Sequence, residues 1–348
     1  MEVIKKRFIW ADVLRILAIY LVIVVHSFPS ANFSRDLTTS WPFIISFTIA
    51  KTCVPLFVML SGALLLGKTE TYKLFFKKRI GKVLIPWVIW TLIYMFWNYN
   101  VNHYAASTIP QWKYFFELTF LSQLWFLPLI FSLYLMTPLL RLITAKFKKT
   151  DQIYLIFLWF IWVSVLPFLH PSLAFPGTPM GLLFLATYYC GYFFLGFILT
   201  KLKLPKNMNL LSLGIIVSGI MLTFIEIFLI KNPITYPTVI FDYFAPGIVI
   251  TSTGLFLFIY DLFSNRLSIG NNRLKSLIIT LSSASLGIYI VHGLLMQVFG
   301  TNLHKYFLFK VDSLPLLENY LDALIIFSFS FLFVYLLKKI PLVRRIVP

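Results

Sequence analysis

The chain has 348 residues, 59% of them hydrophobic and 12% charged, with a mean hydropathy of +0.87. A soluble domain does not keep this much apolar surface from water, so the composition excludes an ordinary soluble enzyme and indicates a polytopic membrane protein in a lipid bilayer. The net charge of +18 at pH 7 would suit nucleic-acid binding. However, the basic residues lie between apolar segments and form no stripe, so we expect no nucleic-acid partner.

Ten apolar segments are long enough to cross a bilayer, which predicts an all-α fold of about ten transmembrane helices. They cover residues 8–28, 42–66, 80–99, 121–143, 152–170, 182–200, 209–230, 243–262, 277–299 and 321–337. The first segment follows a basic stretch, as a signal peptide would, but its apolar part is too long for one, and we expect it to be retained. Cys53 and Cys190 both fall within apolar segments, so neither a disulfide nor a metal site is indicated.

The positions of the basic residues give an independent test of this span count. With a cytoplasmic N-terminus, 23 of the 30 Lys and Arg residues lie in the inner segments and 5 in the outer ones. This is the positive-inside pattern, so we predict a multi-pass protein of the cell membrane with both termini cytoplasmic. The longest outer loops, residues 100–120 and 300–320, are too short for a domain. We therefore expect residues 1–348 to form one integral-membrane domain with no appended soluble domain.

The first span carries an acid, a guanidinium and an imidazole. Arg15 and His26 are 11 positions apart, which places them about 20° apart around a helix and roughly 16 Å apart along its axis. An always-charged group one turn inside a membrane helix needs a polar surrounding, so we predict that both face a polar cavity, Arg15 on the cytoplasmic side and His26 on the outer side. Asp12 either pairs with Arg15 at i,i+3 or lies at the helix end.

The ten residues enclosed by Arg15 and His26 resemble the first span of the membrane-bound acyltransferase-3 family. Four further stretches are similar to the family's motifs in the same order, and the resemblance covers essentially the whole chain. They are VPLFVMLSGALLL at residues 54–66, KKRIGKVLIP at 77–86, LWFLPLIFSLYLMTP at 124–138 and SLGIYIVH at 285–292. Lys82 stands where an arginine is common in the family.

The resemblance implies that the protein transfers an acyl group, most often acetyl, from cytoplasmic acyl-coenzyme A. The acceptor would be a hydroxyl of a cell-surface glycan or lipid-linked sugar, so the expected reaction is O-acetylation in polysaccharide modification. Acyl-coenzyme A, with acetyl-coenzyme A expected first, would be the co-substrate, and no metal is needed. Some family members carry an added extracytoplasmic domain. This chain is expected either to acylate its acceptor directly or to act with a separate extracytoplasmic transferase.

His26 and Arg15 are the predicted catalytic residues. Imidazole is the usual side chain that removes a proton near neutral pH, so we expect His26 to act as general base on the acceptor hydroxyl. A covalent acyl-histidine step is an open alternative. Two roles are open for Arg15, holding a coenzyme A phosphate or polarising the thioester carbonyl, with Asp12 orienting its guanidinium.

A basic run ahead of the third span, Lys77, Lys78, Arg79 and Lys82, lies on the predicted donor side. These cations could bind the phosphates of coenzyme A. Topology alone also demands cytoplasmic cations at this place. The family motif selects Arg79, which with Lys82 is our candidate for donor binding.

Late in the chain, Ser285, Tyr289 and His292 follow one another at i, i+4 and i+7, which predicts a polar stripe on one face of the ninth span. The stripe places His292 near the middle of the membrane, where an unpaired ring is costly. It is either satisfied by a neighbouring helix or takes part directly in catalysis. Tyr289 and His292 are therefore candidates for the substrate site.

Four other residues are candidates for substrate binding. Ser61 and its neighbour Gly62 either contribute to the site or only permit close helix packing. Trp125 either stacks on a sugar or belongs to the aromatic belt at the membrane surface. Lys51 and Glu226 are ionisable groups in apolar spans and by default mark the cavity. Glu226 could also bind sugar or reach the interface, and a pairing of the two is an open question.

Three functions fit these observations. The first is the membrane O-acyltransferase. The second, a transporter or lipid-linked sugar flippase, would also have many spans and buried charges, but it predicts inverted repeats and interrupted helices in matching halves, and the sequence has no internal symmetry. In the third, a sensor or assembly scaffold, Arg15 and His26 would merely hold helices together.

Overall fold

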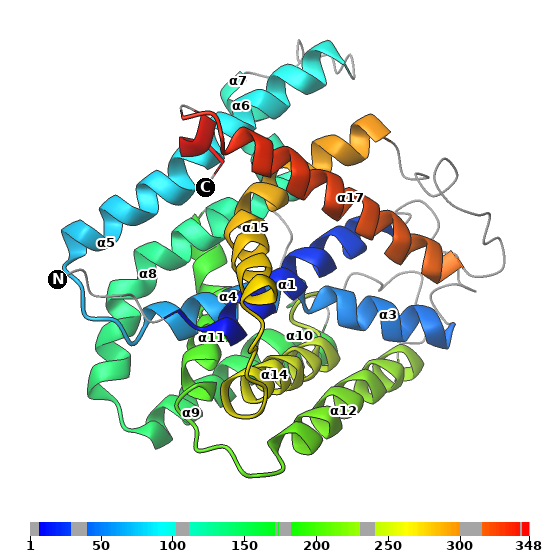
Figure 1. Cartoon of the computed structure of the whole chain (residues 1–348). Helices are drawn as coiled ribbons and strands as arrows, with labels where there is room; N and C mark the ends of the chain where they lie inside the picture. Colours follow the sequence, from blue (N-terminus) through cyan, green and yellow to red (C-terminus); the bar gives the residue numbers. More distant parts are fainter. Residues whose placement is uncertain are drawn as a thin grey trace.

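The computed structural model is a bundle of helices (Figure 1) and describes residues 7–28, 40–101, 111–170, 173, 182–229, 241–299, 315–341 and 343–347. No strand occurs within these ranges. Nine helices among the described residues are long and apolar enough to cross a membrane. The predicted class, a polytopic all-α membrane protein, is thereby confirmed.

The first half of the chain forms the helices from α1 to α8, with a π-helical segment η1 and a 3-10 turn η3. Their bounds are α1 Ile9–Ser27, α3 Trp41–Lys51, α4 Cys53–Leu65, α5 Tyr72–Arg79, η1 Ile80–Leu84, α6 Ile85–Asn100, α7 Gln111–Leu121, η3 Gln123–Trp125 and α8 Phe126–Lys146. Each predicted span of this half contains at least one of these helices, because each carries an uninterrupted apolar run that can satisfy its backbone only internally.

The second half continues in the same manner. Its elements are α9 Lys149–Phe160, η4 Ile161–Val165, α10 Leu166–Leu169, α11 Leu182–Leu199, α12 Met208–Leu229, α14 Pro246–Asp261, η6 Leu262–Arg266, α15 Asn272–Phe299, α17 Pro315–Leu337 and η7 Val343–Arg345. The sixth predicted span is α11, of which the part Ala186–Leu199 is apolar but shorter than the nine long helices. Six of the ten predicted spans therefore have their counterparts here.

The structure adds three details to the predicted spans. The second span is interrupted at Thr52, where α3 ends and α4 begins. The third helical stretch starts at Tyr72, eight residues before the prediction, because the basic residues of α5 continue the helix outside the apolar run. Part of the predicted outer loop at residues 100–120 is helical, as α7, although its composition is too polar for a span.

Prolines explain two of the irregular segments. The π-helical segments η1 and η4 each end two residues before a proline, Pro86 and Pro167 respectively. Proline lacks the backbone N–H and its ring collides with the carbonyl four residues earlier, so the preceding turn widens to i→i+5 bonding.

Helix α1 lies in the middle of the bundle (Figure 1), where it packs against α3, α4, α14, α15 and α17. Leu14, Ala18 and Ile19 are fully buried in these contacts. Helix α1 is therefore surrounded by other helices of the bundle on most sides.

Glycines bring α4 and α11 into backbone contact. A Cβ atom on Gly62 would lie 1.6 Å from the carbonyl oxygen of Phe193, and one on Gly196 would lie 2.0 Å from that of Met59. Without side chains at these positions, dispersion contacts between the two backbones become possible, which is how small residues stabilise helix pairs in lipid. The prediction of close packing at residues 61–62 is confirmed for Gly62.

Candidate active site

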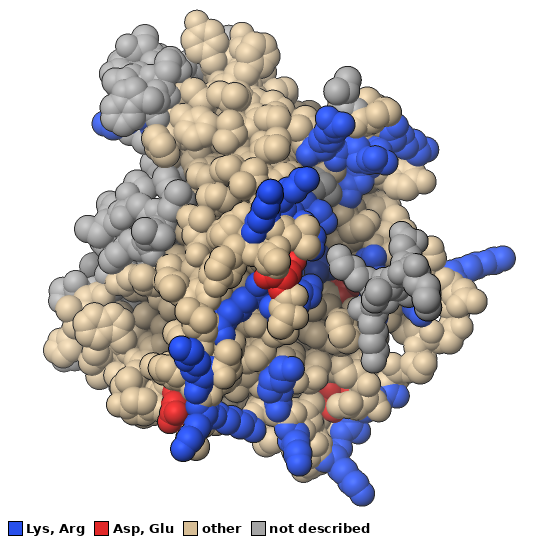
Figure 2. Space-filling view, turned by 90° about the vertical axis from the view of Figure 1, so that its left-hand side faces the viewer, with Lys and Arg blue, Asp and Glu red and all other residues tan. Residues whose placement is uncertain are grey.

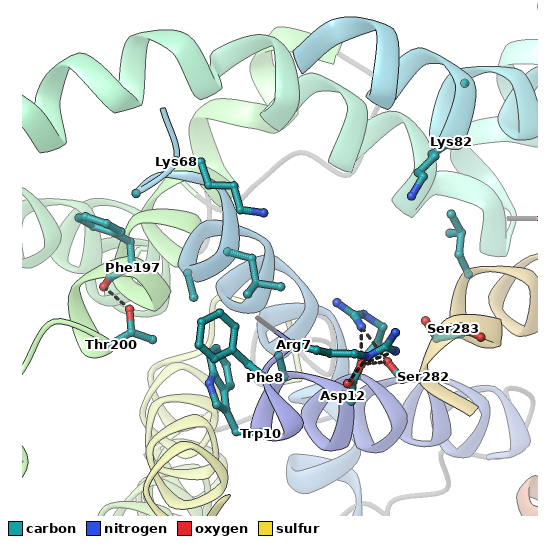
Figure 3. Close-up of a pocket in the computed structure, with 18 of the residues that line it drawn as sticks. Arg7, Phe8, Trp10, Asp12, Lys68, Lys82, Phe197, Thr200, Ser282 and Ser283 are labelled. Carbon is teal, nitrogen blue, oxygen red and sulfur yellow. Dashed lines mark hydrogen bonds and ion pairs between the residues drawn. The ribbon is translucent and has the colours of Figure 1, made fainter. Parts of the chain in front are cut away.

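A cavity of about 1410 Å³ opens at the N-terminal end of α1, next to Arg7 and Arg15. We call this end of α1 the basic end and the cavity the basic cavity. Figure 2 shows Lys and Arg side chains gathered over one face of the molecule, with few acids among them. Among the described residues that line the cavity, the basic ones are Arg7, Arg15, Lys68, Lys82, Lys201, Arg344 and Arg345, and the acid is Asp12. In Figure 3, Lys68 and Lys82 approach this basic cavity from opposite sides.

Asp12 is the centre of a polar network on the cavity wall (Figure 3). Arg7 donates to both of its carboxylate oxygens, at 2.8 and 3.0 Å, and Arg15 Nη1 donates at 3.3 Å. The Ser282 hydroxyl donates to Asp12 at 2.6 Å and accepts from Arg15 Nη1 at 2.7 Å. Asp12 is only 3% exposed, and a carboxyl group buried this deeply is costly without such hydrogen-bond and ion-pair partners.

The predicted pairing of Asp12 with Arg15 is confirmed, but its nearer partner, Arg7, was missed. The Arg15 side chain is 28% exposed and uses only Nη1 in this network, so its other N–H groups have no partner among the described residues. They are available to a ligand in the cavity. Ser282 was also missed, although it continues the predicted Ser285–Tyr289–His292 stripe by one turn toward the basic end.

Arg79 lies in a separate ionic cluster. Glu70 accepts from Lys78 at 2.9 Å, from Arg79 at 3.4 Å and from Arg141 at 3.5 Å. Both guanidiniums also lie against the Phe75 ring, at 4.7 and 4.8 Å from its centroid. Burial alone would raise the pKa of Glu70, but the Lys78 hydrogen bond and the neighbouring cations together lower it below its ordinary value.

The two candidates for donor binding, Arg79 and Lys82, lie in different surroundings. Lys82 lines the basic cavity, whereas Arg79 is absent from its described lining and is held by Glu70. This difference between Arg79 and Lys82 was not predicted, because Glu70 precedes the basic run by several residues. Arg141 Nε and Nη2 also donate to the carbonyl of Leu65, at 3.1 and 2.9 Å, which joins α8 to the end of α4.

At the opposite end of α1, His26 faces His292 of α15, with 5.4 Å between the ring centroids. His26 is exposed, whereas His292 is fully buried. His292 Nδ1 lies 2.5 Å from the Tyr289 carbonyl oxygen, which can only accept, so Nδ1 carries the proton. Nε2 of the neutral ring is then a free acceptor, and it has no partner among the described residues.

The backbone around His292 is fixed by two tyrosines. The Tyr94 hydroxyl donates to the carbonyl of Ile290 at 2.8 Å and accepts from the backbone N–H of Leu294 at 3.1 Å, so it stands between two groups that would otherwise bond within α15. The Tyr289 hydroxyl donates to the Gln123 carbonyl and accepts from the backbone N–H of Phe126 at 3.2 Å. Tyr289 therefore has a structural role, whatever else it contacts.

Helices α1 and α15 thus run in the same direction with two matched contacts. Arg15 meets Ser282 near the basic cavity, and His26 meets His292 further along. Ser285 lines the basic cavity, but His26 does not. The prediction that Arg15 and His26 line one cavity therefore needs correction, because buried apolar residues such as Ile19 and Val22 occupy the interval between them.

Lys51 lies near His26 at the C-terminal end of α3, beside the break at Thr52. Its Nζ is 4.6 Å from the centroid of the Tyr243 ring and interacts electrostatically with Asp242 and with His26. Asp242 was missed by the sequence analysis because it precedes α14 in a short turn. The structure shows no ion pair between Lys51 and Glu226, which answers the question of whether these two residues pair with each other.

Three further candidates have mainly structural contacts. Glu226 is 1% exposed and accepts from the backbone N–H of Gly247 at 2.8 Å, so it caps the start of α14 and does not reach the interface. Trp125 packs against Tyr189 and Tyr243, with the centroids 6.0 and 5.6 Å apart. Ser61 donates to the carbonyl of Phe57 in its own helix at 2.9 Å. Their contacts with substrate remain predictions.

Comparison with known proteins agrees with the motifs. The family model of an acyltransferase domain, acyltransferase-3, matches residues 8–339. No curated protein and no solved structure matches the chain.

Proposed function

Because the chain belongs to the acyltransferase-3 family, we propose that this membrane acyltransferase is an O-acyltransferase that uses cytoplasmic acyl-coenzyme A. Acetyl is the first acyl group to test, and the acceptor is a hydroxyl of a cell-surface or lipid-linked saccharide. The observation that carries the proposal is the pair of sites along α1 and α15, a cationic cavity at one end and two facing imidazoles at the other.

The basic cavity suits a polyanionic donor. Coenzyme A carries a diphosphate and a 3′-phosphate, and lysines and arginines bind phosphates by charge-assisted hydrogen bonds. The cavity volume of about 1410 Å³ is larger than the roughly 300–1,000 Å³ of ordinary small-molecule pockets, as a nucleotide with a long pantetheine arm requires. We propose that this end and both termini lie in the cytoplasm, an orientation that the positive-inside pattern of the loops supports.

The exposed ring of His26 suits the acceptor step. In the proposed reaction it removes the proton of the acceptor hydroxyl, whose oxygen attacks the carbonyl carbon of the thioester. The new C–O ester bond forms, the C–S bond breaks, and the coenzyme A thiolate takes up one proton. Arg15 is positioned near the donor to bind a phosphate or the thioester oxygen. His292 Nε2, fixed as an acceptor, is positioned to hold or receive a proton from His26.

Transfer requires the acyl group to pass from the basic cavity to His26. The interval along α1 is roughly 16 Å, and apolar side chains fill it in this structure, Ile19 and Val22 among them. We therefore propose that the pantetheine arm enters between α1 and α15 and displaces these side chains. The polar stripe of α15 follows the same path.

The experiment uses the purified full-length protein with acetyl-coenzyme A labelled in the acetyl group and a panel of saccharide acceptors. Label on the saccharide is expected with the unaltered protein and its loss in His26→Ala. His170, an exposed histidine after α10, supplies the matched control, because His170→Ala should transfer normally. Transfer by His26→Ala at the unaltered rate would exclude His26 as the base.

The same preparation tests the transporter hypothesis. A discontinuous span is typical of transporters, and α3 and α4 meet at such a break. In vesicles, a transporter or flippase would move an unlabelled saccharide across the membrane without acylating it, and a scaffold would do neither.

A further inference from the structure

The segment after α17 returns to the basic cavity. It forms the short turn η7, whose residues Arg344 and Arg345 line the cavity. Figure 1 shows this red segment turned back toward α6. These residues lie beyond the part of the chain that the family model matches, which ends at residue 339. Their placement therefore follows from the tertiary structure of this chain.

Buried contacts hold the segment in place. The Trp90 indole N–H donates to the carbonyl of Ile346 at 2.9 Å. The Val347 side chain is fully buried against α15, where a Cβ atom on Gly287 would lie 2.8 Å from it. A hydrogen bond and an anchored apolar side chain thus follow directly after the two arginines. Their guanidiniums project from a fixed backbone, which reduces the entropy lost when they bind a ligand.

The lining residues Lys82, Arg344 and Arg345 are cations without a carboxylate partner among the described residues, and Lys338 outside the described lining adds a further positive charge near Lys82. Lys338 Nζ donates to the carbonyl of Ser283 at 2.8 Å, and burial together with the Lys82 charge lowers the pKa of Lys338. No carboxylate pairs with Lys82, Arg344 or Arg345 within the described part of the chain. Like charges held close together are unfavourable, and a bound polyanion would relieve this repulsion.

We infer that Arg344 and Arg345 bind the phosphate groups of the nucleotide part of the donor. The inference rests on the proposed function, in which that donor is acyl-coenzyme A. The planar guanidinium matches a phosphate with two parallel hydrogen bonds. Both arginines are exposed, whereas Arg15 is only 28% exposed. This difference in exposure orients the donor, with its phosphates at the mouth of the cavity and its thioester deeper, toward α1 and α15.

The test compares the double variant Arg344→Gln, Arg345→Gln with the unaltered full-length protein. Equilibrium binding of coenzyme A should weaken about tenfold. In the transfer assay, KM for acetyl-coenzyme A should rise by a similar factor with little change in kcat. S-acetylpantetheine, a donor without phosphates on a nucleotide, should be used equally well by both proteins. A structural role of the arginines would instead impair both donors alike.

Two variants serve as controls. Lys339→Gln removes a cation that lies 5.0 Å from the Tyr335 ring and outside the described cavity lining, so coenzyme A binding should not change. The conservative pair Arg344→Lys, Arg345→Lys should restore part of the affinity. Thermal unfolding in detergent checks that all variants fold.

The outcomes separate this inference from the proposed function. Normal coenzyme A affinity in the double glutamine variant overturns the inference and leaves the function intact. Coenzyme A binding that depends on both arginines, without transfer to any saccharide, supports the inference and contradicts the proposed acceptor. An unaltered protein that does not bind coenzyme A overturns both.

Discussion

The two ends of α1 carry different kinds of site, a cationic cavity at one end and a pair of histidines at the other. At the basic end, seven cations line a large cavity among the described residues, and several of them are exposed. At the other end, the rings of His26 and His292 face each other with their centroids 5.4 Å apart, Lys51 acts electrostatically on His26, and His292 is fully buried. When several cations bind a polyanion, the loss of one leaves the others in place. A proton transfer, in contrast, depends on one ring in one position. Substitutions should therefore have graded effects at the basic end and large effects at the other.

The largest expected effect is that of His26→Ala. Losing a general base should reduce kcat about 10³-fold, while the affinity for coenzyme A should stay within twofold because His26 does not line the basic cavity. Single-turnover kinetics and equilibrium binding on the same preparation measure the two quantities. A parallel loss of donor affinity would mean that the two ends form one site.

Arg15→Lys should have the next largest effect. In Arg15 one nitrogen contacts Asp12 and Ser282 and the rest of the planar guanidinium is left for a ligand, a geometry that a lysine ammonium does not reproduce, so kcat/KM should fall by about 10- to 100-fold with normal membrane insertion. Arg7→Lys is the matched control, since Arg7 binds the same carboxylate but is more exposed. Equal losses in both variants would show that the Asp12 network acts only as a structural unit.

His292→Gln should reduce kcat by about tenfold without changing coenzyme A binding. Glutamine can still donate to the Tyr289 carbonyl, but it cannot accept and release a proton. The pH profile of kcat should change from that of two coupled rings to that of a single ring. An unchanged pH profile and an unchanged kcat would show that the contact between the two rings serves packing only and has no part in proton transfer.

The smallest effect is expected for Glu70→Gln. Removing this carboxylate frees Lys78, Arg79 and Arg141, and the free energy of unfolding should fall by about 1 kcal/mol. Because the pKa of Glu70 is lowered in the folded protein, its contribution is present above the ordinary glutamate pKa and is lost as the pH falls through the folded-state value.

Thermal unfolding between about pH 7 and about pH 2, a range that extends below the lowered pKa of Glu70, measures this difference. The two proteins should converge at the acidic end of the range. Convergence at neutral pH would show that the Glu70 cluster contributes nothing to stability. A gain in coenzyme A affinity in Glu70→Gln would show in addition that Arg79 can reach the donor once it is released.

The candidate site was predictable where neighbours in the sequence are neighbours in space. The Asp12–Arg15 contact follows from i,i+3 spacing, and the stripe on α15 follows from helical periodicity. Arg7, Tyr94 and Asp242 could not be found in this way. Arg7 precedes the helix, Tyr94 acts on another helix through its hydroxyl, and Asp242 lies in a turn.

The sequence by itself determined the class of protein, nearly all of its spans and its family. These depend on composition, on apolar length and on short motifs, all of which are local along the chain. Only the tertiary structure decided that His292 faces His26, that Arg79 pairs with Glu70 and that the segment after α17 lines the basic cavity. These contacts join helices far apart in the chain, and in lipid their partners are selected by close packing and hydrogen bonding, which hydropathy does not encode.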